Sequence, residues 1–141
     1  MKEVLFYVLM IPIMFGMASC SSANKADVKN LDGKWTIVEV KGLKVERENM
    51  PYIEFNMTEN KVHGNAGCNM FNTVIIPDAK DISAFTLKPA AATMMACLDM
   101  KLEDVILSAL ETITNVQYGS SANEMKLVDK NGNVILVLSK N

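Results

Sequence analysis

The sequence has no excess of basic residues, and this excludes a large class of functions. Its 141 residues carry 14 Lys and Arg against 16 Asp and Glu, a formal net charge of −2. Proteins that bind nucleic acid concentrate Lys and Arg on one face, and a domain held on anionic lipid by charge needs a polybasic run. The sequence therefore predicts no nucleic-acid partner and no electrostatic attachment of the folded part to a membrane.

Residues that could build a catalytic site are also scarce. His63 is the sole histidine, and it lies five residues from Cys68. A nucleophilic Cys–His pair needs an imidazole that holds the thiolate, a group that orients the imidazole, and an oxyanion site. No sequence feature supplies these groups, so His63 is expected at the surface or at a strand edge. Gly64 and Gly67 are not part of a phosphate-binding loop, because no Lys-Ser/Thr follows them and no helix opens there. The chain is predicted not to be an enzyme and to use no cofactor.

The N-terminal residues are typical of a targeting segment. Val4–Met17 is an uncharged apolar run that is too short to span a bilayer comfortably as a permanent helix. It ends in Met17-Ala18-Ser19-Cys20, which resembles the bacterial lipobox, in which the cysteine is lipidated and becomes the new N-terminus. We therefore predict a lipoprotein signal peptide at residues 1–19 and lipidation of Cys20. The alternative is an uncleaved membrane anchor with a chance cysteine.

A polar segment follows the predicted lipidation site. Ser21–Asn30 has small and polar residues without apolar periodicity, so residues 20–30 are predicted to be the lipidated cysteine and a flexible tether. Residues 31–141 are then a single domain, expected to be a monomer. By resemblance to Gram-negative lipoproteins, a serine after the lipidated cysteine favours the outer membrane, with the domain facing the periplasm.

Two cysteines remain once Cys20 is lipidated, and the oxidising compartment outside the inner membrane favours a bond between them. A Cys68–Cys97 disulfide would close a loop of about 28 residues and stabilise the domain by roughly 3–4 kcal/mol. One alternative is a pair of buried free thiols. Another is a soft-metal site for Cu(I), since four methionines flank the cysteines: Met70, Met94, Met95 and Met100. Methionine is also a common core filler, and the sequence is expected to bind no metal.

Short runs of β-branched and aromatic residues predict a mainly β domain. The predicted strands cover residues 35–40, 52–57, 61–63, 70–76, 82–87, 115–118, 125–128 and 134–138. The alternation slips after Ile37, which predicts a bulge or a strand covered on both sides. Ile53, Phe55 and Met57 are expected on one face. Asn131-Gly132 predicts a two-residue hairpin turn between the last two strands.

One segment has the spacing of an amphipathic helix. Its apolar stripe is made by Leu102, Val105, Ile106, Ala109, Leu110 and Ile113. Asp99 is placed to cap this helix, and Glu103 and Asp104 are expected in solvated, helix-end roles that favour the dipole. About eight strands and one helix predict a small antiparallel β-barrel-like roll packed with one amphipathic helix.

The stretch Gly64–Asn69 predicts a tight turn, because glycine permits positive φ and close backbone approach and asparagine can bond its own backbone two residues on. Together with Thr93–Cys97 it resembles the META domain, also called the HslJ-like family of bacterial heat-shock lipoproteins. The matching residues are Leu31, Gly33, Trp35, Gly64, Asn65, Gly67, Cys68, Asn69, Phe71, Thr93, Met95, Ala96, Cys97 and Glu103. Two residues depart from the pattern: Met94 stands where an arginine or another polar residue is common, and Leu98 stands where proline often follows the cysteine. The resemblance implies the same β-barrel-like roll and an envelope location, and it implies no defined activity.

These observations predict a lipid-anchored envelope protein of the META type that acts without catalysis. It would be a binding module or a stress-related envelope-maintenance module, with an envelope protein or an apolar small molecule held in the roll as its partner. One alternative is a stress-induced scaffold without a ligand. The other is a soft-metal or thiol-active protein that uses Cys68, Cys97 and the neighbouring methionines.

Overall fold

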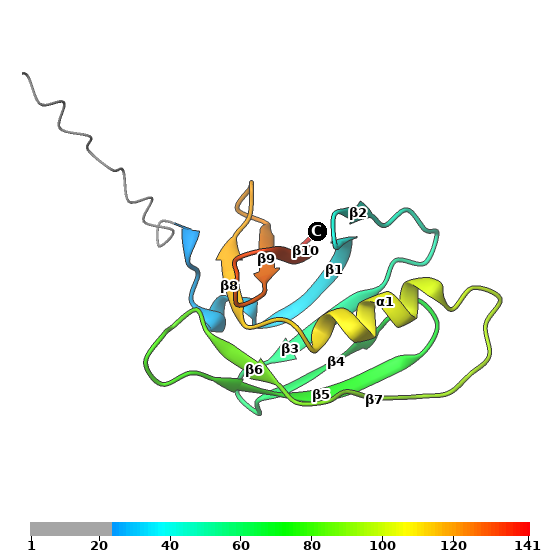
Figure 1. Cartoon of the computed structure of the whole chain (residues 1–141), viewed down its shortest axis with the longest axis horizontal. Coiled ribbons are helices and arrows are strands. Elements are labelled where there is room, and N and C mark those ends of the chain that lie inside the picture. The colour runs from blue at the N-terminus through cyan, green and yellow to red at the C-terminus, as the bar shows by residue number, and fades with distance from the viewer. Residues whose placement is uncertain (1–23) are drawn as a thin grey trace, which may run out of the picture.

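The computed structural model describes residues 24–141, which form ten short strands and one α-helix (Figure 1). In chain order the elements are a 3-10 helix (Val28–Leu31), β1 (Gly33–Val40), β2 (Leu43–Lys44), β3 (Tyr52–Asn56), β4 (Lys61–Asn65), β5 (Met70–Pro77), β6 (Phe85–Leu87), β7 (Ala91–Ala92), α1 (Lys101–Leu110), β8 (Asn115–Tyr118), β9 (Glu124–Val128) and β10 (Val134–Ser139). None of the helices in this range has the length and apolarity that crossing a membrane requires. The predicted signal peptide and Cys20 lie outside the described residues.

The strands build one antiparallel sheet in the order β6-β5-β4-β3-β1-β10-β9-β8, with β2 paired to β1 and β7 paired to β5. The two ends of this order meet. The Phe85 N–H donates to the Thr114 carbonyl at 2.9 Å, and the Val116 N–H donates to the Ser83 carbonyl at 2.9 Å. The sheet therefore curls into a nearly closed barrel, which confirms the predicted mainly β, barrel-like roll with one helix.

The interior of the roll is filled by apolar side chains from most of the strands and from α1. The largest fully buried side chains are Phe55, Phe71, Leu31, Ile37, Ile53, Ile75, Ile106, Leu127, Leu136, Leu138, Val62 and Val116. The strand alternation that predicted a common face for Ile53 and Phe55 is confirmed, and Met57 lies half-buried beyond the end of β3. The predicted slip after Ile37 is a register shift in the pairing of β1 with β10.

The helix α1 runs alongside the sheet (Figure 1) and buries Ile106, Ala109 and Leu110 in the core, as its apolar stripe predicted. Its N-cap lies one residue after the predicted cap, Asp99. Met100 is the N-cap residue and makes no capping bond, while the Asp99 carboxylate accepts a hydrogen bond from the Lys101 N–H at 3.0 Å.

Two local predictions were wrong, and short polar side chains explain both. The last hairpin turn is not the two-residue turn predicted at Asn131-Gly132. The loop spans 129–133, because the Asp129 carboxylate accepts hydrogen bonds from the N–H groups of Asn131 and Asn133. The strand predicted from residue 82 begins at Phe85, because aspartates in the preceding loop bind its backbone N–H groups. The two-residue strands β2 and β7 are too short for any periodicity to predict them.

The expected flexible tether does not extend to Asn30. Ala26 and Val28 are buried, and their N–H groups donate to the carbonyls of Val116 (3.2 Å) and Ile82 (2.8 Å). The Asp27 carboxylate accepts a hydrogen bond from the Lys29 N–H and caps the 3-10 helix. The folded domain therefore starts several residues before the predicted boundary at 31, because two apolar side chains in a polar stretch suffice to anchor it.

Candidate functional site

The turn between β4 and β5 is built by glycine and asparagine in the roles that their chemistry predicts. A Cβ on Gly64 would collide with the Tyr52 carbonyl oxygen and lie 2.8 Å from the Phe71 ring, so only glycine fits. Gly67 has φ +117°, which side-chain-bearing residues rarely adopt. The Asn65 Oδ1 accepts a hydrogen bond from the Gly67 N–H at 2.8 Å, which confirms the bond expected two residues on.

Asn69 ends this turn and is 2% exposed. Its backbone N–H donates to Glu103 Oε1 at 2.7 Å, and its Nδ2 donates to Glu103 Oε2 at 2.8 Å. Glu103 lies in the first turn of α1 and is 3% exposed, so the prediction that this carboxylate faces solvent was wrong. A buried carboxylate requires hydrogen-bond donors, and Asn69 supplies two of them from a distant part of the chain.

The same asparagine side chain holds the segment that follows β7. Its Oδ1 accepts hydrogen bonds from the Met95 N–H at 2.7 Å and from the Thr93 hydroxyl at 2.9 Å, and its Nδ2 also donates to the Met95 carbonyl at 3.1 Å. The Thr93 hydroxyl in turn accepts a bond from the Met70 N–H at 3.1 Å. One asparagine side chain therefore ties this segment to both β5 and α1.

Cys68 and Cys97 are joined as a disulfide, with their Cα atoms 6.3 Å apart. The alternative of two buried free thiols does not fit this geometry, because Cys97 is exposed and Cys68 only partly buried. We call Asn69, Glu103, Thr93 and this disulfide the clamp, and residues 91–100 the clamped loop. The far end of the loop is fixed as well, because Asp99 forms an ion pair with Arg47 at 2.6 Å. The Lys101 N–H and the Arg47 guanidinium hold the pKa of Asp99 below its ordinary value.

The clamped loop displays apolar side chains to solvent. Met94 is 97% exposed, Met95 is 57% exposed, and Leu98 is fully exposed. Met70, on the adjoining strand β5, is also exposed. The motif residue Ala96 is exposed between them. The motif residues of the clamp therefore have a structural role, because they fasten an exposed apolar loop to the barrel.

The N-terminal motif residues are structural too. The Trp35 indole N–H donates to the Leu31 carbonyl at 2.7 Å, and both residues are buried. Gly33 has φ +100° between them, a conformation that favours glycine. Lys140 lies over the Trp35 ring, 4.4 Å from its centroid, and so joins the C-terminus to this corner.

His63 does not meet Cys68 as a nucleophilic pair. It lies on β4 opposite Glu54 of β3, with its Nε2 3.2 Å from the Glu54 carboxylate, and both side chains are partly exposed. The sulfur of Cys68 is occupied by Cys97. Within residues 24–141, no group of three or more His, Cys, Asp or Glu side chains could hold a metal ion.

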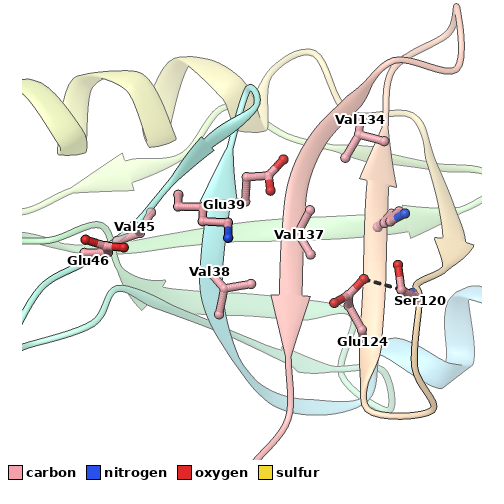
Figure 2. Close-up of a pocket in the computed structure, with 10 residues that line it drawn as sticks. Val38, Glu39, Val45, Glu46, Ser120, Glu124, Val134 and Val137 are labelled. Carbon is pink, nitrogen blue, oxygen red and sulfur yellow. Dashed lines mark hydrogen bonds between the residues drawn. The ribbon is translucent and has the colours of Figure 1, made fainter.

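The outer face of β1, β10 and β9 carries an open groove of about 490 Å³ (Figure 2). Its floor is aliphatic, with Val38, Val134 and Val137, and charged side chains surround it: Glu39, Lys44, Glu46, Glu124 and Lys126. Ser120, which also lines the groove, contacts Glu124 through its backbone N–H at 2.9 Å. This contact comes from the backbone of Ser120 and not from its hydroxyl.

The fold and the clamp define a class of protein: a small, nearly closed antiparallel barrel with one packed helix and an exposed loop held by a buried asparagine–glutamate contact. The model of the META domain matches residues 27–141, and the chain belongs to this family. The family is not known for an enzymatic activity.

Among solved structures, the chain is similar to the NMR structure of a protein from Burkholderia xenovorans. The TM-score is 0.63 at 17% sequence identity, and the match covers 93% of this chain and 99% of that chain. At this identity the likeness shows the fold alone. No curated protein matches the sequence.

Proposed function

We propose that this chain is a lipid-anchored envelope protein that binds a protein partner through its clamped loop, without catalysis. The observation that carries the proposal is the display of Met94, Met95 and Leu98 on a loop that is fastened at both ends. Exposed apolar side chains that gather on one surface mark interaction sites. A loop that is already ordered loses little conformational entropy when it binds, so its side chains contribute more of their contact energy to affinity.

The filled interior favours a protein partner over an apolar small molecule held in the roll. Side chains such as Phe55, Phe71 and Leu136 occupy the inside of the barrel. The bonded sulfurs of Cys68 and Cys97 likewise offer no thiolate, so a thiol-active or soft-metal role would first require their reduction. The scaffold without a ligand remains the competing function, and crosslinking in cells decides between the two.

The experiment is photocrosslinking in the envelope of cells that make the full chain. A photoreactive amino acid replaces Leu98 in one variant and Leu43 in the matched control, since both leucines are exposed and Leu43 lies on β2, outside the clamped loop. We expect a discrete crosslinked protein from position 98 that is absent or at least fivefold weaker from position 43. Absent crosslinking at both positions would support the scaffold instead, and equal crosslinking at both would rule out the clamped loop as the specific binding surface.

The anchor is tested separately. We propose that lipidated Cys20 holds the chain in the outer membrane with the domain in the periplasm, as the lipobox resemblance implies. Cys20→Ala should release the chain from membranes or stall its processing, seen by fractionation and by the mass of the N-terminus. A cleaved Cys20→Ala chain that stays in the membrane fraction would refute the lipid anchor.

A further inference from the structure

The first described residues of the chain attach to the barrel at a fixed point. Lys25 pairs through its backbone with Gln117 of β8, and its Nζ lies 2.8 Å from the Asp81 carboxylate. The next residue, Ala26, is buried and donates its N–H to the Val116 carbonyl. The segment that leads toward Cys20 therefore leaves the domain from a defined patch of its surface.

The length of chain before this point limits where the domain can sit. This step rests on the proposed lipidation of Cys20. Five peptide steps separate Cys20 from Lys25, and each spans at most about 3.6 Å, so Lys25 stays within roughly 18 Å of the lipidated residue. A domain of about 100 residues has a radius of gyration near 13 Å, so its diameter exceeds this reach. The patch around Lys25 therefore stays near the membrane. The clamped loop, between β7 and α1, lies in Figure 1 on the side of the domain away from the blue start of the described chain.

Two exposed side chains suited to a lipid surface flank the entry point. Ile82 is 65% exposed, and its carbonyl accepts the Val28 N–H at 2.8 Å. Tyr118 is 51% exposed, and its hydroxyl accepts a hydrogen bond from Asn30 Nδ2 at 3.1 Å. Tyrosine prefers the boundary between lipid and water, because its ring is apolar and its hydroxyl is polar.

Charge around this patch is close to balanced, so electrostatic attraction to anionic lipid is not the driving force. The exposed Lys29 and Lys80 stand beside Asp27 and Asp81, and Asp81 is already paired with Lys25. Insertion of an apolar and an aromatic side chain, with the anchor keeping the patch close, accounts for contact without a polybasic surface.

We propose that the patch formed by Lys25, Ile82 and Tyr118, here called the entry face, lies against the lipid surface of the membrane that holds Cys20. This orientation places the clamped loop on the side of the domain that faces away from the membrane, where a protein partner can reach it.

The test uses lipidated full-length protein, purified from membranes and reconstituted in vesicles of phosphatidylethanolamine and phosphatidylglycerol. Ile82→Trp reports on the entry face, and Leu98→Trp is the matched control on the clamped loop, since both positions are exposed and aliphatic. Trp35 is buried and common to all samples, so its signal is subtracted using the unsubstituted protein. Vesicles containing lipid labelled with a quencher near the headgroup are compared with unlabelled vesicles.

We expect the emission of the tryptophan at position 82 to fall at least twofold in quencher-containing vesicles, and that at position 98 to change by less than a tenth. Adding Tyr118→Ser to Ile82→Trp should weaken the quenching. Vesicle-bound protein with no quenching at position 82, or equal quenching at both positions, would overturn the entry face and leave the lipid anchor standing. If the full-length protein purified from membranes carries no lipid on Cys20 and does not associate with vesicles, the lipid anchor is overturned, and the entry face with it.

Discussion

Replacing Asn69 with alanine should destabilise the domain far more than the loss of an exposed polar side chain on the adjoining strand β5. The substitution removes the side-chain bonds to Glu103, Met95 and Thr93, while the backbone N–H of residue 69 still reaches Glu103 Oε1. The carboxylate of Glu103 then keeps one donor and loses the other inside a site that is 3% exposed.

The size of this loss in stability depends on which of the broken hydrogen bonds water can replace. A neutral hydrogen bond contributes about 0.5–1.5 kcal/mol and one to a charged group about 1.5–3 kcal/mol. The partners in the clamped loop are exposed and can bind water, whereas the Glu103 oxygen cannot. We therefore expect Asn69→Ala to lower the free energy of unfolding by about 3 kcal/mol. For a domain of this size the midpoint temperature falls by roughly 12 °C.

Urea unfolding of the oxidised protein, followed by circular dichroism, measures this loss. Asn72→Ala is the matched control, because Asn72 is an exposed residue of the adjoining strand β5 and should change stability by less than about 0.5 kcal/mol. A double-mutant cycle with Glu103→Ala should give a coupling energy of about 1 kcal/mol or more. Additive effects, or a loss from Asn69→Ala as small as the control, would refute the clamp.

Two further substitutions test neighbouring features. Cys68→Ser should lower the free energy of unfolding by about 3–4 kcal/mol, because the bridge to Cys97 spans a sequence separation of 29; reductant should lower the midpoint temperature of the unsubstituted protein and leave the variant unchanged. Hydrogen bonds from Lys25 and from Ser83 hold the pKa of Asp81 at about 2, below its ordinary 3.8. A lowered pKa contributes stability above pH 3.8 that is lost as the pH falls through 2, so Asp81→Asn should flatten the fall of the urea midpoint between pH 4 and pH 2.

A different outcome would contradict each of these two predictions. A Cys68→Ser variant that still responds to reductant, or an unsubstituted protein that does not, would argue against the bridge. Asp104→Asn removes an exposed carboxylate of α1 and should leave the pH dependence unchanged. Equal flattening by both aspartate variants would mean that the ion pair of Asp81 is not its source.

Features that depend on residues close in sequence could be predicted. The turn after β4 follows from the conformational freedom of Gly67 and from the bond that Asn65 makes two residues on. The apolar stripe of α1 follows from its spacing, because the face that repeats every three to four residues is the one that packs. In both cases the sequence pattern and the physical cause lie within a dozen residues.

The burial of Glu103 shows why the clamp itself escaped prediction. Its place three residues before Ile106 and seven before Leu110 put it on the buried side of α1, and this signal was available. Its partner Asn69, however, is 34 residues away, and no local pattern encodes that contact. Closure of the barrel through Ala84 and Asn115 could not be predicted from the sequence for the same reason, because it depends on how the whole sheet curls.

The position of β10 has a consequence for the order in which the domain assembles. This last described strand lies between β1 and β9, so it joins the first strand of the sheet to the paired strands β9 and β8. Contacts between residues this far apart form late, because a long loop must close before they yield any stabilisation. A chain that is still emerging from the ribosome therefore has β1 without this neighbour until residues 134–139 arrive, and the barrel closes only once β10 is available.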